Sequence, residues 1–180
     1  VVLAATDAAS TATAHTITVT ITDTNDEAPV WTTSATASVA EGATAVATLA
    51  ATDSDTADSG GLTYSITTDD PGSGTQFSVS GTALTIAAQD YETPACGSGS
   101  NSLTCVVVLS ATDAASTATA HTITVTITDT NDQAPAWTTS ATASVAEGAT
   151  AVATLAATDS DTADSGGLTY SITTNDPSGT

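Results

Sequence analysis

The stretch HTITVTITDTNDEAPVW at residues 15–31 returns almost unchanged as HTITVTITDTNDQAPAW at residues 121–137. In its first half Thr alternates with apolar residues, which places Ile17, Val19 and Ile21 on one face of an extended strand. Its second half is rich in Asp and Asn and ends in Pro and Trp. The stretch therefore predicts a half-buried strand followed by an acidic linker.

The chain contains no side-chain cation to balance this linker. Its 180 residues include 20 Asp and Glu and no Lys or Arg, which gives a formal charge of −20. Binding to phosphate backbones depends on Lys and Arg, so nucleic acid and anionic membrane surfaces are excluded as partners on charge grounds. The balancing charge must come from solution.

Composition predicts a folded chain with a thin core and no catalytic site. Hydrophobic residues make up 40% but are mostly Ala and Val, and aromatic residues make up 3%. No apolar run approaches the roughly 20 residues that span a bilayer, and no signal peptide opens the chain. His15 and His121 are interpreted as surface residues of strand edges rather than catalytic bases. An enzyme is not expected.

The repeat divides the chain. Asp7 matches Asp113, an offset of 106 residues, and residues 35–68 match residues 141–174. We therefore predict the C-terminal end of one repeat with its linker at 1–27, a complete repeat at 28–133 and the N-terminal part of the next at 134–180. A window from a longer array is favoured over a short protein ending at Thr180.

The complete repeat predicts an all-β sandwich. About seven alternating segments, separated by Gly, Pro, Asp and Ser, are typical of an immunoglobulin-like Greek-key sandwich of antiparallel strands. The expected strands are residues 36–40, 45–52, 62–67, 77–80, 83–88, 103–112 and 121–128.

If each strand runs from one pole of the sandwich to the other, strand direction sorts the acids onto the two poles. Stacked repeats then bring acids together at two junctions. The first junction combines Asp23, Asn25 and Asp26 of the incoming linker with Asp53, Asp55 and Asp113. The second combines Glu41, Asp90, Glu92, Asp129, Asn131 and Asp132 with Asp159 and Asp161.

Such clusters need a cation. Two carboxylates 4 Å apart repel by roughly 4 kcal/mol at an effective dielectric of about 20. Hard oxygen ligands without thiolate or imidazole suit Ca²⁺, and Mg²⁺ is the weaker candidate because it loses water reluctantly.

These residues resemble the cadherin repeat. The linkers resemble the family motif DxNDNAPxF, DSD at residues 53–55 and 159–161 resembles its DxD, and DYE at residues 90–92 resembles its DRE. Asp7 and Asp113 are similar to its strand-end Asp, and Glu41 and Glu147 to its early Glu. The resemblance implies up to three Ca²⁺ ions per junction and a stiffened rod. Glu27 and Gln133 replace the final Asn of the motif, and Trp31 and Trp137 replace its Phe.

Cys96 and Cys105 are the only cysteines of the chain. In a secreted-looking chain the pair predicts a disulfide that closes a small loop, whereas buried free thiols and a metal site are weaker alternatives. Asp58, Asp69 and Asp70 are interpreted as loop residues in preference to auxiliary cation sites.

The leading hypothesis is a structural segment of a calcium-stiffened extracellular or cell-surface fibre or stalk, in contact with neighbouring repeats or identical subunits. The near-identity of the repeats favours a microbial source. The alternatives are the stalk of a calcium-dependent adhesin with its binding tip elsewhere, and a spacer in a large secreted enzyme.

Overall fold

The computed structural model describes residues 1–55, 61–69, 75–96, 103–115, 117–162 and 167–174. These residues contain no helix of the length and apolarity that would cross a membrane. They form thirteen strands, named in chain order: β1 (Val2–Thr6), β2 (Ala12–Thr16), β3 (Val30–Trp31), β4 (Thr36–Ala40), β5 (Ala45–Thr48), β6 (Ala51–Thr52), β7 (Thr63–Asp69), β8 (Phe77–Ser80), β9 (Ala83–Ile86), β10 (Thr104–Thr112), β11 (Ala118–Thr128), β12 (Ala136–Trp137) and β13 (Ala157–Thr158).

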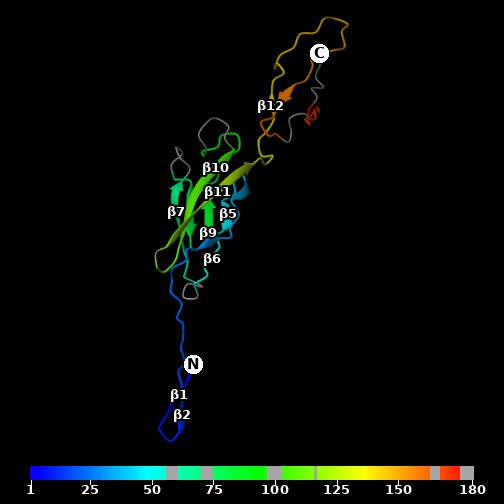
Figure 1. The fold of residues 1–180 in the computed structure, drawn as a ribbon. Coiled ribbons are helices and arrows are strands. Elements are labelled where there is room, and N and C mark those ends of the chain that lie inside the picture. The colour runs from blue at the N-terminus through cyan, green and yellow to red at the C-terminus, as the bar shows by residue number, and fades with distance from the viewer. Residues whose placement is uncertain (56–60, 70–74, 97–102, 116, 163–166, 175–180) are drawn as a thin grey trace.

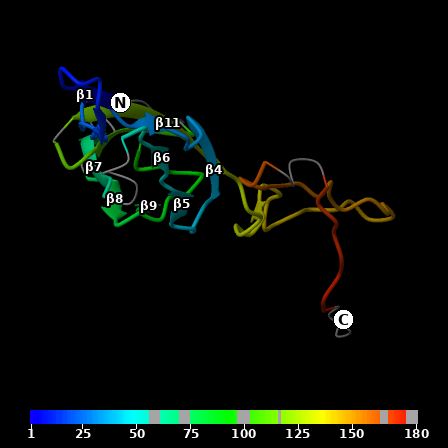
Figure 2. The same ribbon diagram turned by 60° about the horizontal axis from the view of Figure 1, so that its bottom comes forward.

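The central repeat is a two-layered sandwich. One layer is a four-stranded sheet in the order β4-β11-β10-β7, and the other is a three-stranded sheet in the order β5-β9-β8. Figure 2 shows the two layers facing each other, and β3 pairs with β6 beside them. The predicted all-β sandwich is confirmed.

Strand directions follow the predicted alternation between poles. The pairs β10–β11, β10–β7, β5–β9 and β8–β9 are antiparallel. The pair β4–β11 is parallel, with Thr36 opposite Thr124 and Ala40 opposite Thr128. Because β4 and β11 are the first and last long strands of the seven, alternation gives both the same direction. Both therefore end at the far pole, which is the end of the sandwich opposite the incoming linker.

The strand boundaries differ from the prediction at several places. In the N-terminal piece, where a half-buried strand was predicted from His15 to Thr22, β2 ends at Thr16, and the apolar residues Ile17, Val19 and Ile21 are exposed. Residues 45–52, expected as one strand, form β5 and β6, which pair with different partners. Leu49 lies between them, and its side chain is buried while its backbone N–H donates to Thr82. The short strand β3 was not predicted, because a two-residue bridge carries too little periodicity to recognise.

The core lies between the two layers. Its buried apolar side chains come from both sheets, and Trp31, Tyr64 and Tyr91 pack against its margin. Alternate residues of β10 and β11 point inward, which agrees with the period of two in their sequences. The buried cluster consists of Val39, Leu49, Phe77, Leu84, Ile86, Cys96, Cys105, Val107, Leu109, Ile123, Val125 and Ile127.

The two flanking pieces lie at opposite ends of the sandwich (Figure 1). The N-terminal piece forms the β1–β2 hairpin, with Leu3 opposite His15. The C-terminal piece forms the β12–β13 bridge, with Trp137 opposite Ala157. The central repeat is therefore flanked by the two acidic linkers, where the two junctions were predicted.

Candidate metal centre

The acids of the second junction converge at the far pole. Among the described residues, two groups of three carboxylates have oxygens within 4.8 Å of one another. Both groups contain Glu92, which therefore links them. One group is Glu41, Asp90 and Glu92, and the other is Glu92, Asp129 and Asp161.

Glu41 connects two segments of the central repeat. It directly follows β4, and its Oε2 accepts a hydrogen bond from the backbone N–H of Tyr91 at 2.8 Å. Its Oε1 accepts one from Thr130 at 2.7 Å. A single carboxylate thus fixes the DYE segment beside the linker that leaves β11.

The second group spans two repeats. Asp129 directly follows β11, and its Oδ2 accepts hydrogen bonds from both the backbone N–H and the hydroxyl of Thr162. Asp161 is fully buried, and its Oδ2 accepts the backbone N–H of Gln133 at 3.0 Å. Asp159 Oδ1 in turn accepts the backbone N–H of Asp161. The C-terminal piece is therefore bonded directly to the linker before it.

Several buried oxygens at this junction lack a hydrogen-bond partner among the described residues. They are both carboxylate oxygens of Glu92 and Oδ1 of Asp129, Oδ2 of Asp159 and Oδ1 of Asp161. Buried polar atoms are normally satisfied, so a group of unsatisfied carboxylate oxygens needs a counter-ion. The donor set is entirely oxygen, which fits Ca²⁺.

The electrostatics agree with a missing positive charge. Burial above all, and then the proximity of the Asp90 and Glu41 carboxylates, raises the pKa of Glu92 from its ordinary 4.5 to about 7. Burial and the charges of Asp159, Asp129 and Asp132 also raise the pKa of Asp161. In contrast, the hydrogen bond from Thr93 lowers the pKa of Asp90. Without a cation, Glu92 and Asp161 are therefore costly to ionise.

The first junction repeats part of this geometry. Asp55 Oδ2 accepts the backbone N–H groups of Asp26 and Glu27, and Asp55 itself is buried. Oδ2 of Asp53 and Oδ2 of Asp113 are buried without a hydrogen-bond partner in the described part of the chain. No group of three carboxylates as close as those of the second junction occurs here among the described residues.

Two predicted ligands, Asp7 and Glu147, lie apart from these clusters. Asp7 is exposed and its Oδ1 accepts the N–H groups of Ala9 and Thr11, while Glu147 is exposed in the C-terminal piece. Asp69 was predicted to be a loop residue, but it is the last residue of β7, and its carboxylate accepts the N–H groups of Gln76 and Phe77. Asp58 and Asp70 lie outside the described residues.

Three contributors to the site were not predicted from the sequence. The backbone amides of Thr130 and Gln133 bind carboxylates across the junction, and Thr162 donates twice to Asp129. The Gln133 side chain, which stands in place of the final Asn of the motif, donates to Asp132 at 2.8 Å. The one available signal was the Thr that follows DSD in both copies.

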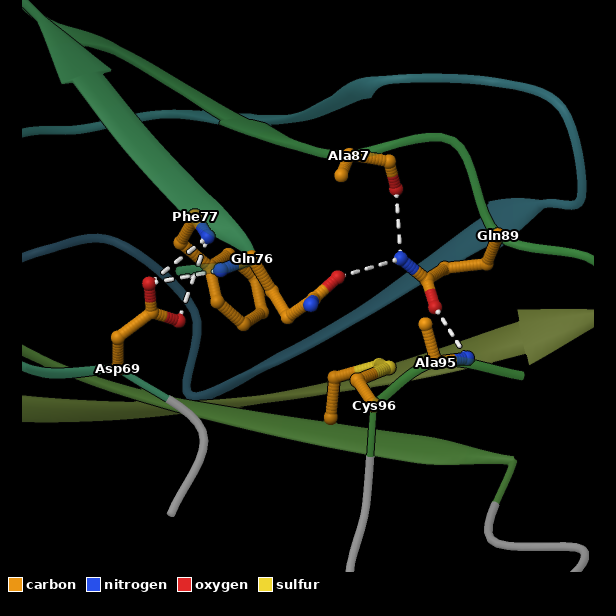
Figure 3. Close-up of a disulfide and its surroundings, with 8 residues drawn as sticks. Asp69, Gln76, Phe77, Ala87, Gln89, Ala95 and Cys96 are labelled. Atoms are coloured by element: carbon orange, nitrogen blue, oxygen red, sulfur yellow. Dashed lines mark hydrogen bonds between the residues drawn. A yellow bond between two sulfur atoms is a disulfide. The ribbon is translucent and has the colours of Figure 1, made fainter. Parts of the chain in front are cut away.

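The two cysteines form a disulfide behind the site. Cys96 and Cys105 are bonded, with their Cα atoms 5.4 Å apart, and both are buried in the core. Figure 3 shows the bond beside Ala95 and Gln89, one residue before Asp90. The predicted disulfide is confirmed, and it lies close in sequence to the DYE segment.

Comparison with known proteins identifies one family. The sequence model described as Cadherin domain matches residues 35–130. A search of curated proteins returned no significant match.

Solved structures give the same result. The Protocadherin GammaB4 extracellular domain is 27% identical with a TM-score of 0.55, over 70% of this chain and 21% of that chain. Protocadherin gammaB7 EC3-6, a cis-dimer structure, is 27% identical with a TM-score of 0.57, over 71% and 32%. Human CDH23 EC21-23 shares the fold at 24% identity and a TM-score of 0.62, over 89% and 53%. The chain thus spans about a fifth to a third of the first two structures.

Proposed function

The chain belongs to the cadherin family, and from this premise we propose that it is a structural segment of an extracellular fibre or stalk stiffened by Ca²⁺ between its repeats. Cadherin domains are adhesion-type domains that typically bind calcium. The observation that carries the proposal is the set of unpartnered buried carboxylate oxygens contributed by two successive repeats. We expect no catalytic activity.

The proposed ligands are the predicted acids and Asn residues, and Ca²⁺ would supply the positive charge that the chain lacks. At the second junction they are Glu41, Asp90, Glu92, Asp129, Asn131, Asp132, Asp159 and Asp161, and at the first they are Asp23, Asn25, Asp26, Asp53, Asp55 and Asp113. Asp7 and Glu147 would serve the junctions beyond these two. We propose up to three ions per complete junction.

Stiffening follows from the position of the ligands. Asp129 and Asp161 belong to successive repeats, and with Glu92 they carry negative charge into one small volume. Without a cation their repulsion opposes stacking, whereas a bound cation attracts all three. Extracellular calcium-binding modules have dissociation constants for Ca²⁺ of about 10⁻⁴ to 10⁻³ M, so the calcium concentration outside the cell would decide whether the rod stays stiff.

The test is a calcium titration of the whole chain, followed by small-angle X-ray scattering and thermal melting. We expect about 10 mM Ca²⁺ to raise the free energy of unfolding by about 1 to 3 kcal/mol per bound ion. In the scattering experiment, it should narrow the distribution of end-to-end distances of the chain. Mg²⁺ should act more weakly. Asp161→Asn should abolish the response of the second junction, whereas Asp70→Asn, which removes one charge from a predicted loop, should retain it. Identical profiles in Ca²⁺ and EDTA would refute the proposal.

The second candidate function is the stalk of a calcium-dependent adhesin. It is favoured by the extracellular domains to which this chain is similar, one of them in a cis-dimer structure. The two candidates predict the same calcium response, and they differ in whether a binding domain accompanies these repeats in the full protein.

A further inference from the structure

The segment that carries Asp90 and Glu92 has no regular secondary structure to position it. Between the end of β9 and Cys96 no strand is assigned. An irregular segment in water samples many backbone conformations, and fixing each residue costs about 1 to 2 kcal/mol. Other contacts must therefore define where these two carboxylates lie.

Gln89 supplies one set of those contacts. This side chain is buried, and its Nε2 donates to Gln76 Oε1 at 3.0 Å and to the Ala87 carbonyl at 2.8 Å. Its Oε1 accepts the backbone N–H of Ala95 at 3.0 Å (Figure 3). The amide thus closes the segment into a loop by joining residues on both sides of the acids.

The disulfide supplies the second contact. Cys96 follows Ala95 directly and is bonded to Cys105, the second residue of β10, which lies opposite Val125 of β11. Both sulfurs belong to residues of the buried core. The end of the loop is therefore covalently attached to β10, an inner strand of the four-stranded sheet.

The loop is also bonded to the metal site. The Gln89 carbonyl accepts the backbone N–H of Gly42 at 2.9 Å, and the Tyr91 N–H donates to Glu41 Oε2 at 2.8 Å. Both contacts join the loop to the turn that follows β4. A continuous path of bonds thus runs from the core, through Cys96 and Gln89, to the carboxylates.

We infer that Gln89 and the Cys96–Cys105 disulfide are positioning residues of the second junction, which set its affinity for divalent cations by fixing Asp90 and Glu92. This inference rests on the proposed function, because it assigns the determinants of affinity at that same site. Outer-shell partners of metal ligands typically change affinity by about 10- to 100-fold when removed. The first junction contains no equivalent of this loop in the sequence, so it is an internal reference.

The test is a Ca²⁺ titration of the 180-residue chain followed by hydrogen–deuterium exchange. The peptides DTNDEAPVW (residues 23–31) and DTNDQAPAW (residues 129–137) report on the two junctions separately, because their masses differ. For Cys96→Ser/Cys105→Ser, we expect the calcium midpoint of the second peptide to rise about tenfold or more, with the first unchanged. Gln89→Met, which keeps the disulfide, should raise the same midpoint by a smaller factor.

A matched control separates positioning from general loss of stability. Val107→Ala removes buried apolar volume from the same strand as Cys105 without changing a residue of the loop or the disulfide. It should lower the melting temperature while leaving the calcium midpoints of both peptides in place. In EDTA, faster exchange at residues 90–95 is expected for the cysteine variant and not for Val107→Ala.

The outcomes distinguish this inference from the proposed function. If wild-type protein shows no calcium-dependent protection in either peptide, the calcium function fails. If wild-type protein responds at both junctions but neither the cysteine variant nor Gln89→Met moves the second midpoint, the positioning role alone is wrong. Equal shifts in both peptides would likewise contradict it, since they would reflect a global effect.

Discussion

The β1–β2 and β10–β11 hairpins differ in sequence at one position, Ala4 against Ser110, over residues 1–26 and 107–132, but they have different surroundings. Their register is the same, with Leu3 opposite His15 and Leu109 opposite His121. β2 nevertheless ends at Thr16, whereas β11 continues to Thr128. The hairpin turn is therefore encoded locally, and the remainder of the long strand needs partners.

Those partners are identifiable. The part of β11 that β2 lacks pairs with β4 on one side and with the first residues of β10 on the other. Its apolar residues also enter the core. Ile127 is 1% exposed, and its equivalent Ile21 is 93% exposed. An alternating sequence thus specifies which face is apolar, but burial depends on a second layer.

The largest expected effect is a matched pair of substitutions at this position. Ile127→Ala should lower the free energy of unfolding by about 2 to 5 kcal/mol, because it leaves a cavity in the core. Ile21→Ala should change it by no more than about 0.5 kcal/mol. Urea denaturation in EDTA, followed by circular dichroism, measures both. Equal losses would show that the N-terminal strand is packed as its copy is.

The same dependence on context explains what the sequence could predict. Alternation fixes strand direction, so the sorting of acids such as Asp53 and Asp113 to one pole and Glu41 to the other follows from counting strands. The split at Leu49 and the contacts of Thr162 depend on the approach of segments that no local pattern encodes. The shared position of Glu92 in both acid groups was hidden for the same reason.

A second prediction concerns pH and separates the two junctions. Because the metal-free folded chain retains a proton on Glu92 up to a pKa of about 7, against an ordinary 4.5, it binds more protons than the unfolded chain in this range. Stability without calcium should therefore fall as pH rises between these two values. The raised pKa of Asp161 also makes the metal-free stability fall as pH rises. The lowered pKa of Asp90 has the opposite effect, but only at pH values below its ordinary 3.8 or so.

Glu92→Gln removes the larger part of this dependence. Melting temperatures in EDTA across this pH range should decline for the wild-type chain and decline less for the variant. The 129–137 peptide should exchange faster as pH rises, after correction for intrinsic exchange, and the 23–31 peptide should follow a flatter profile since Glu92 has no equivalent there. A rise in metal-free stability with pH would contradict the assignment.

The smallest expected effect tests the comparison at the histidines. His121 stacks on Trp31 with ring centroids 4.9 Å apart, and Trp31 Nε1 donates to the Thr119 carbonyl. His15, the same residue in the first hairpin, is exposed. Stacked aromatic pairs contribute about 0.5 to 1.5 kcal/mol, so His121→Ala should lower stability by that amount and His15→Ala by less than about 0.5 kcal/mol.

Tryptophan fluorescence adds a reading that stability alone does not give. In a Trp137→Phe background, Trp31 is the only indole, and His121→Ala should make it more accessible to acrylamide whereas His15→Ala should not. Since Trp31 begins the repeat directly after the linker, this stacking attaches the linker to β11. If both histidine variants leave quenching and stability unchanged, the pairing of β3 with β6 positions Trp31 without help from the last strand.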